Sequence, residues 1–98
     1  MRILVVEDEK ELNKAIADKL KEENYIVDTC FDGLEAYDHL TMAEYDGVIL
    51  DILLPGMNGL DLLAKLRHDF ITTPIMLLSV LNSDEAIIRG LDMGADDY

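Results

Sequence analysis

The segment Leu4–Glu9 reads LVVEDE, so three apolar residues run directly into three carboxylates. The apolar part extends back over Arg2–Val6 and is a nearly continuous hydrophobic run. Such a run is typical of a strand that is covered on both faces of a parallel sheet. A covered strand that ends in a cluster of negative charge raises the question of what the acids do at the edge of the sheet.

Three later segments have the same apolar character, and helical patterns separate them. We expect further strands at Tyr25–Cys30, Gly47–Leu50 and Pro74–Val80. We expect helices at Glu9–Glu23, Leu34–Ala43, Gly59–His68 and Ser83–Met93. This alternation predicts one α/β domain, with a doubly wound parallel sheet and helices on both of its faces.

The first predicted helix has the clearest periodicity. Leu12, Ile16 and Leu20 stand at helical spacing and form an apolar stripe. Asp8 is the candidate N-cap, since Glu11 follows three places later, as in a capping box. Taken alone, the acids after the first strand are explained as the start of a helix.

Composition and charge exclude several classes of protein. The 98 residues suffice for one domain, and 50% of them are hydrophobic, as in a globular protein. With 8 basic and 21 acidic residues, the net charge of −13 should repel nucleic acids and anionic membranes. Cys30 is the only cysteine, which excludes an internal disulfide, and no pattern marks a signal peptide or membrane span. We therefore expect a cytoplasmic protein.

The acids at the strand ends are the strongest functional candidates. Ligands of doubly wound sheets bind beyond the carboxyl ends of the strands, where the strand order reverses. Glu7 and Asp8 follow the first strand, and Asp51 ends the third. If these strands are neighbours, the three carboxylates converge, and their mutual repulsion requires compensation. Mg²⁺ suits such a site, with a backbone carbonyl such as that of Leu53 as a further ligand.

Asp51 is also a candidate nucleophile. A cation that neutralises a carboxylate and a phosphoryl group allows the two to approach each other. The carboxylate can then attack phosphorus and form an acyl phosphate. Ser79 lies near the end of the fourth predicted strand and therefore belongs to the same edge of the sheet.

Four motifs together resemble the receiver domains of bacterial two-component response regulators. They are LVVEDE, VILDILLPGMNG, PIMLLSV and IRGLDMGADDY, and the resemblance covers all 98 residues. It implies a flavodoxin-like three-layer sandwich whose five-stranded sheet has the order 2-1-3-4-5. The fifth strand and fifth helix would lie beyond Tyr98, so we expect residues 1–98 to be a C-terminally truncated receiver domain without its effector domain.

The resemblance implies roles for the acids. Asp51 is implied to be the phosphoacceptor, which takes a phosphoryl group from a histidine of a sensor histidine kinase. Asp8 and Glu7 are implied to bind Mg²⁺ with Asp51, and the backbone carbonyl of Leu53 is the implied fourth ligand. The domain would be a signalling switch rather than an enzyme, because it would assist only its own phosphorylation and dephosphorylation.

The resemblance also implies a switch and a dimer. Ser79 is similar to the family's hydroxyl residue that contacts the phosphoryl group, and Tyr98 to the aromatic that turns inward. The motifs are most similar to those of receivers joined to a winged-helix DNA-binding domain, so DNA would be a partner only through that effector. Such relatives form homodimers over the face of the fourth helix. The candidate interface residues are Arg89, Asp96 and Asp97, for which solvation is the simplest role.

Two departures from the family pattern concern phosphorylation. A lysine that is expected to contact the phosphoryl oxygens would lie three places beyond Tyr98. Val80 stands where relatives usually have a small residue, and its branched side chain would restrict the water that hydrolyses an acyl phosphate. This departure predicts a long-lived phosphorylated state.

Three other functions are alternatives. A haloacid dehalogenase phosphatase also uses a strand-end aspartate, but it needs a second aspartate two places later, where this chain has Leu53. A nucleotide- or flavin-binding module needs glycines and hydroxyls after the first strand, where this chain has three acids. A receiver-like interaction module that accepts no phosphate is the strongest rival. Val80 and the missing lysine favour it, whereas the presence of Glu7, Asp8, Asp51 and Ser79 argues against it.

Overall fold

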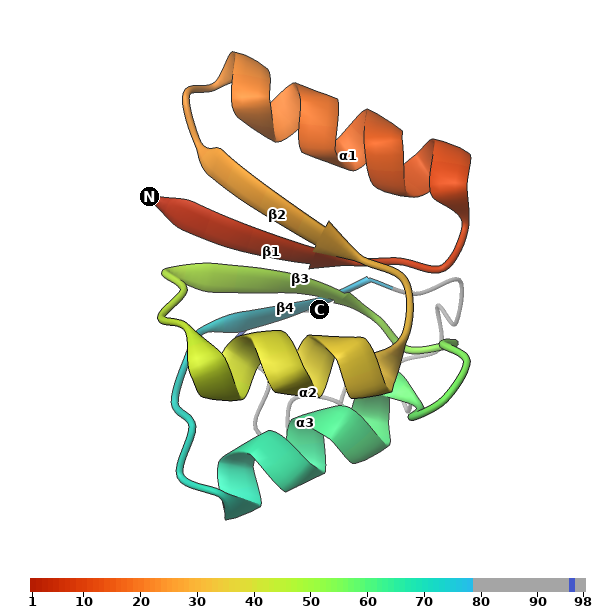
Figure 1. Cartoon of the computed structure of the whole chain (residues 1–98), viewed down its shortest axis with the longest axis vertical. Helices are drawn as coiled ribbons and strands as arrows, with labels where there is room; N and C mark the ends of the chain where they lie inside the picture. Colours follow the sequence, from red (N-terminus) through yellow and green to blue (C-terminus); the bar gives the residue numbers. More distant parts are fainter. Residues whose placement is uncertain (79–95, 97–98) are drawn as a thin grey trace.

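The computed structural model describes residues 1–78 and residue 96. Within them, four strands and three helices alternate along the chain (Figure 1). In chain order the elements are β1 (Arg2–Val6), α1 (Lys10–Glu22), β2 (Ile26–Cys30), α2 (Gly33–Met42), β3 (Gly47–Asp51), α3 (Gly59–His68) and β4 (Ile75–Leu78). The predicted helix Ser83–Met93 and the last two residues of the predicted strand Pro74–Val80 lie outside the described residues.

The four strands form one parallel sheet in the order β2-β1-β3-β4. The predicted doubly wound, flavodoxin-like arrangement is therefore confirmed. The chain passes from β1 to β2 on one side and then crosses to β3 on the other, so the strand order reverses between β1 and β3. Such a reversal opens a crevice at the carboxyl ends of the two strands.

Helices cover both faces of the sheet. α1 lies on one face, whereas α2 and α3 lie side by side on the other (Figure 1). No helix in the described residues is long and apolar enough to cross a membrane.

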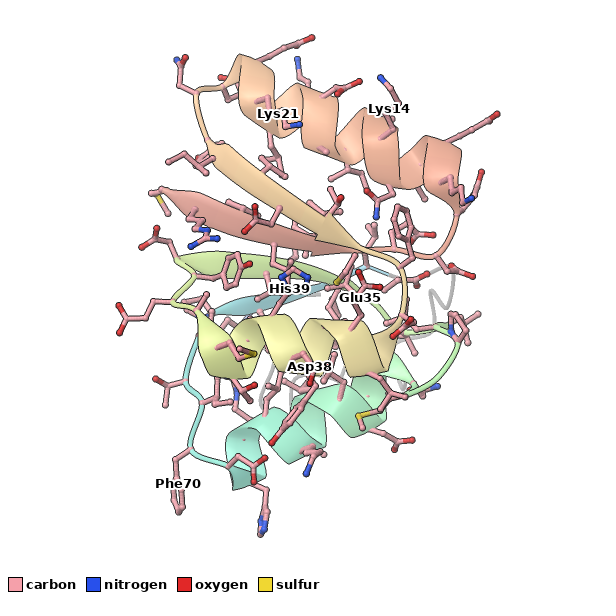
Figure 2. All side chains as sticks on the ribbon, in the orientation of Figure 1. Lys14, Lys21, Glu35, Asp38, His39 and Phe70 are labelled. Atoms are coloured by element: carbon pink, nitrogen blue, oxygen red, sulfur yellow. The ribbon has the colours of Figure 1, made fainter. Side chains whose placement is uncertain are left out.

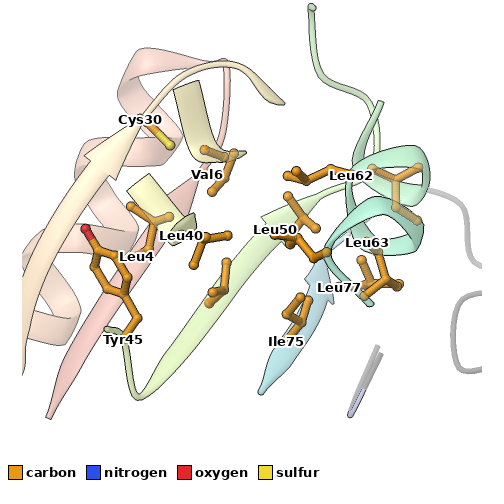
Figure 3. Packing of buried hydrophobic residues seen from close by; sticks show 14 residues of the cluster. Leu4, Val6, Cys30, Leu40, Tyr45, Leu50, Leu62, Leu63, Ile75 and Leu77 are labelled. Atoms are coloured by element: carbon orange, nitrogen blue, oxygen red, sulfur yellow. The ribbon is translucent and has the colours of Figure 1, made fainter. Parts of the chain in front are cut away.

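The hydrophobic core lies between the sheet and the layer formed by α2 and α3 (Figure 3). Leu50 of β3 is fully buried between its neighbours Val6 and Leu77 on the adjacent strands. From α3 come three more fully buried leucines, Leu62, Leu63 and Leu66. Because burial of one such side chain contributes roughly 1.5–3 kcal/mol, this packing holds the strand that ends in Asp51 firmly in place.

The start of α1 differs from its prediction. The N-cap residue is Glu9, and its side chain makes no capping hydrogen bond. The prediction of Asp8 as the cap is therefore wrong. The physical reason lies in the acids themselves: the Glu9 N–H donates to the Glu7 carboxylate (N···O 3.0 Å), and Asp8 lines a pocket with Glu7 and Asp51 instead.

The buried face of α1 also differs from the predicted stripe. Asn13 and Ala17 are the buried residues of the helix, Ile16 and Leu20 are half-buried, and Leu12 is 40% exposed. Each residue rotates an α-helix by about 100°, so docking on Asn13 rather than on Leu12 turns the leucine outward. The prediction of the helix is confirmed, but the prediction of Leu12 on its packed face is wrong.

Asp96 lies beside the amino end of β4. Its N–H donates to the carbonyl of Ile75, and its carboxylate accepts from the Ile75 N–H, both at 2.9 Å. The same carboxylate oxygen pairs with Arg67 of α3 at 3.1 Å. Arg67 also donates to the carbonyls of Ile71 and Thr73, at 2.8 and 2.9 Å. Asp96 is exposed, as expected, but it is tied to α3 and β4 rather than simply solvated.

Candidate functional site

Three acidic side chains meet at the carboxyl edge of the sheet. Glu7 directly follows β1, Asp51 is the last residue of β3, and these two strands are neighbours. Carboxylate oxygens of Glu7, Asp8 and Asp51 lie within 4.8 Å of one another. Glu7 is buried, Asp51 is half-buried and Asp8 is exposed. The structure thus brings together the three acids that the sequence singles out.

The turn between β1 and α1 is fixed through Glu7. Its N–H donates to the carbonyl of Cys30 at the end of β2 (3.2 Å), and its carboxylate accepts from the Glu9 N–H. Its carbonyl accepts from the side-chain amide of Asn13 (3.0 Å). No sequence signal pointed to Asn13, because a polar residue directly after Leu12 is the pattern of an exposed helix position.

Asp51 is oriented by the loop that follows β3. The Leu53 N–H donates to Oδ1 of Asp51 (3.3 Å), and the Gly59 N–H donates to the carbonyl of Ile52 (2.8 Å). A Cβ atom at Gly59 would stand 2.2 Å from the carbonyl oxygen of Asp51, so only glycine lets α3 begin this close to β3. Leu53, the candidate backbone ligand, lines the same pocket as the acids.

A second close approach holds the far side of this loop. Gly33, the first residue of α2, donates its N–H to the carbonyl of Pro55 (3.2 Å). A Cβ atom at Gly33 would lie only 2.0 Å from the carbonyl oxygen of Met57. A local sequence pattern carries no information about contact with a distant loop. Gly33 therefore supports the Asp51 loop in a way that only the structure reveals.

Glu7 carries an electrostatic cost in this arrangement. Burial and the nearby carboxylates of Asp51 and Asp8 raise the pKa of Glu7 from 4.5 to about 7, although the Glu9 N–H acts in the opposite direction. The described lining of the pocket consists of Glu7, Asp8, Glu9, Leu12, Asp51, Leu53 and Leu78, and it contains no basic side chain. A bound cation would relieve this repulsion.

The donor set fits Mg²⁺. Its three carboxylates offer oxygen ligands, and the exposure of Asp8 leaves room for the water ligands that Mg²⁺ usually keeps. A zinc site would favour cysteine or histidine. The only cysteine, Cys30, is buried, and burial raises the pKa of its thiol to about 12. The residues present therefore suit a hard divalent cation.

Of the other predicted site residues, the structure describes only Asp96. Ser79, Tyr98, Arg89 and Asp97 lie outside the described residues, as does Val80. Asp96 is described, but it contacts Ile75 at the amino end of β4, whereas Asp51 ends β3 at the opposite edge of the sheet.

Comparison with known proteins gives a consistent result. The family model described as "Response regulator receiver domain" matches residues 3–98. Response regulator RppA of Synechocystis is 47% identical over 100 residues, and transcriptional regulatory protein CusR of Escherichia coli is 43% identical over 99 residues. Both alignments cover 100% of this chain and 43% of the relative. The chain thus spans less than half the length of these relatives.

Solved structures agree with the sequence relatives. The receiver domain of Francisella response regulator 1452 superposes with a TM-score of 0.97 at 37% identity, over 99% of this chain and 80% of the other. The BeF3-activated receiver domain of Klebsiella pneumoniae RstA has a TM-score of 0.93 at 38% identity, over 100% and 83%. Response regulator TrrA of Thermotoga maritima, solved with Mg²⁺ and BeF, has a TM-score of 0.87 at 35% identity, over 99% and 83%.

Proposed function

Because the chain belongs to the response regulator receiver domains of two-component systems, we propose that it is a phosphorylation-dependent switch in which Asp51 accepts a phosphoryl group with the help of Mg²⁺. The observation that carries the proposal is the convergence of Glu7, Asp8 and Asp51 within 4.8 Å at the carboxyl edge of the sheet. Three acids with no basic side chain in the described lining repel one another and do not stabilise the fold. They suit a bound cation, whose remaining ligand positions a phosphoryl group can fill.

Each acid has its own part in the proposed reaction. Glu7, Asp8 and Asp51 would hold Mg²⁺, with the backbone carbonyl of Leu53 as a further ligand. When bound, the cation supplies charge neutralisation between carboxylate and phosphoryl oxygens. Asp51 is half-buried, and the Leu53 N–H orients its carboxylate through Oδ1. An oxygen of this carboxylate attacks phosphorus, a new O–P bond forms, and the bond to the donor breaks.

Residues beyond the described part complete the proposed switch. Ser79 would contact the phosphoryl group from the end of the fourth strand, and Tyr98 would turn inward in response. Such a two-state movement converts a local change of charge into a change of surface. Val80 would shield the acyl phosphate from water and prolong the phosphorylated state. Faster dephosphorylation of Val80→Ala would support this role, and an unchanged rate would contradict it.

The proposed partners follow from the family and from the relatives. The phosphoryl donor would be a sensor histidine kinase, and the output would be transcription, since CusR and TcrA are named transcriptional regulatory proteins. DNA would be bound only by an effector domain outside this chain, and the protein would act in the cytoplasm. Arg89, Asp96 and Asp97 remain the candidate residues for a homodimer, although Arg67 already pairs with Asp96.

Phosphorylation with a small donor tests the proposal. The full-length protein is incubated with acetyl phosphate and Mg²⁺, and its intact mass is measured. Wild type should gain the mass of one phosphoryl group, and Asp51→Asn should gain none, because the amide is a poor nucleophile. Asp61→Asn, which changes an acid in the first turn of α3, is the matched control and should be phosphorylated like wild type.

The alternative outcomes separate the two leading functions. If neither wild type nor Asp51→Asn gains mass, the receiver-like interaction module becomes the better account. If Asp51→Asn gains mass as wild type does, another residue is the acceptor and the assignment of Asp51 is wrong. Removal of Mg²⁺ with a chelator should abolish the gain in wild type, and a chelator without effect would contradict the role of the cation.

A further inference from the structure

The side chain of Asn13 connects α1 to the ends of two strands. Only 2% of Asn13 is exposed, and it is the one polar residue among the buried positions of α1. Its amide nitrogen Nδ2 donates to the carbonyl of Glu7 and to the carbonyl of Cys30, each at 3.0 Å. The single amide group therefore reaches the residue after β1 and the last residue of β2 at once.

The carbonyl that Asn13 holds has a particular place in the site. It belongs to the peptide bond between Glu7 and Asp8, so its orientation determines where both side chains leave the backbone. The Glu7 N–H donates to the same Cys30 carbonyl that Asn13 contacts. Both backbone groups of Glu7 are thus fixed just beyond the last residue of β1.

We propose that Asn13 is a positioning residue that holds the Glu7–Asp8 peptide in the orientation needed for binding a divalent cation. The inference rests on the proposed function of the Glu7, Asp8 and Asp51 site. Groups that orient metal ligands from outside commonly matter for affinity by about 10- to 100-fold. Packing alone does not require an amide at this position, since the buried residue one turn later, Ala17, has only a methyl group.

Direct titration with Mg²⁺ tests the role. Binding of Mg²⁺ alone to wild type, Asn13→Leu and the control Ala17→Gly is measured by calorimetry, and the free energy of unfolding of each is measured without metal. Asn13→Leu keeps the volume but removes both donors, so its dissociation constant for Mg²⁺ should rise by about 10-fold. Ala17→Gly weakens α1 without touching Glu7, so its dissociation constant should stay that of wild type.

A second readout follows the peptide itself. The backbone ¹⁵N resonance of Asp8 reports on the Glu7 carbonyl, and it should shift in Asn13→Leu but not in Ala17→Gly, already in the metal-free protein. If Asn13→Leu does not fold, Asn13→Ser takes its place, because a hydroxyl can donate to only one of the two carbonyls, and the same rise in the dissociation constant is required.

The outcomes distinguish this inference from the function on which it rests. Failure of wild type to bind Mg²⁺ would overturn the proposed function and the positioning role with it. Wild-type binding together with an unchanged dissociation constant in the Asn13 variant would overturn only the positioning role. Equal weakening in Ala17→Gly would overturn it as well, since the effect would then follow helix stability rather than the two hydrogen bonds.

Discussion

The acid cluster of Glu7, Asp8 and Asp51 differs from a second group of charges that lies near the amino end of β1. We call this second group the Asp28 cluster; it consists of Arg2, Asp28, His39 and Tyr45. Figure 2 shows His39 on the side of α2 that faces the strands. Both clusters lie at the sheet, but one gathers like charges and the other pairs opposite ones.

The Asp28 cluster satisfies itself. Oδ2 of Asp28 accepts from Nη2 of Arg2 and from the Tyr45 hydroxyl, both at 2.7 Å, and from Nε of Arg2 at 3.0 Å. The guanidinium lies 4.8 Å from the centre of the Tyr45 ring, and Nδ1 of His39 is 3.2 Å from the Tyr45 hydroxyl. The hydrogen bonds from Tyr45 and Arg2 lower the pKa of Asp28. These contacts connect β1, β2 and α2, and the paired charges need no ligand to neutralise them.

In the acid cluster, the pKa of a carboxyl group shifts in the opposite direction. Glu7 has a pKa raised to about 7, whereas the pKa of Asp28 is lowered, although both are carboxylates beside a strand. The difference lies in burial and in the neighbours, since Glu7 is buried beside two further acids, whereas Asp28 accepts hydrogen bonds from Tyr45 and Arg2. Acids that lack a described counter-charge point to a ligand, whereas acids that are paired point to a structural role.

The largest expected difference between the clusters is in their dependence on pH. Between pH of about 4.5 and about 7, the folded protein holds a proton on Glu7 that the unfolded chain releases, so rising pH lowers the free energy of unfolding. The contribution of Glu7 is up to about 3 kcal/mol. Urea unfolding in a chelator should show wild type losing this much relative to Glu7→Gln across that range.

The matched control for this measurement is Glu9→Gln, which changes an exposed acid in the same turn. Its stability should follow the wild-type pH curve. Asp28 has the opposite sign, because its stabilising charge is lost only as pH falls through its lowered pKa. If the free energy of unfolding depends on pH in the same way for wild type and Glu7→Gln, ionisation of Glu7 does not destabilise the fold, and the prediction is wrong.

Removal of one hydroxyl should break the Asp28 cluster. Tyr45→Phe keeps the ring beneath Arg2 but removes the donor to Asp28, and a hydrogen bond to a charged group contributes about 2 kcal/mol. The free energy of unfolding should fall by this amount. Tyr25→Phe is the control, since Tyr25 makes no side-chain hydrogen bond within the described residues, and an equal loss there would refute the assignment.

Mg²⁺ should stabilise the protein through the acid cluster and not through the Asp28 cluster. At ten times its dissociation constant, a ligand of the folded state raises the free energy of unfolding by about 1.4 kcal/mol. Thermal unfolding should show this gain in wild type and in Tyr45→Phe, but not in a Glu7→Gln, Asp51→Asn double variant. An undiminished gain in the double variant would place the cation elsewhere.

The smallest effect is expected from the ion pair of the Asp28 cluster. Arg2→Met removes the pair with Asp28 but leaves the Tyr45 hydrogen bond. The two side chains are 44% and 32% exposed, so the loss should be smaller than that of Tyr45→Phe. Lys14→Met, which removes the more exposed pair with Asp18, should cost no more. A loss clearly larger than that of Tyr45→Phe would reverse the order of importance inside the cluster.

The fold and the acid cluster were predictable because both follow from short apolar runs and from what ends them. The segment LVVEDE identifies β1 and its acids, and the apolar run before Asp51 identifies β3. Parallel alternation then places the carboxyl ends of these strands at one edge.

The remaining features depend on contacts between distant residues, which local patterns do not contain. Arg2 and Asp28 come from different strands, and Asp96 contacts Ile75 across a long stretch of chain. Asn13 is buried only because two strand ends present carbonyls to it. The prediction of Asp8 as the cap was wrong for a related reason. A capping box assumes that the acid accepts hydrogen bonds from the first turn of the helix, whereas here Asp8 lines a pocket with Glu7 and Asp51.

The pairing of Asp96 with Ile75 bears on whether a strand from another chain can pair with β4. A parallel sheet grows when a strand from another chain finds free backbone groups along an outer strand. At the first residue of β4, Asp96 occupies both the N–H and the carbonyl, and it places a carboxylate there. Among the described strands β4 is an outer one, and at its first residue another strand would meet a carboxylate and occupied backbone groups instead of free ones.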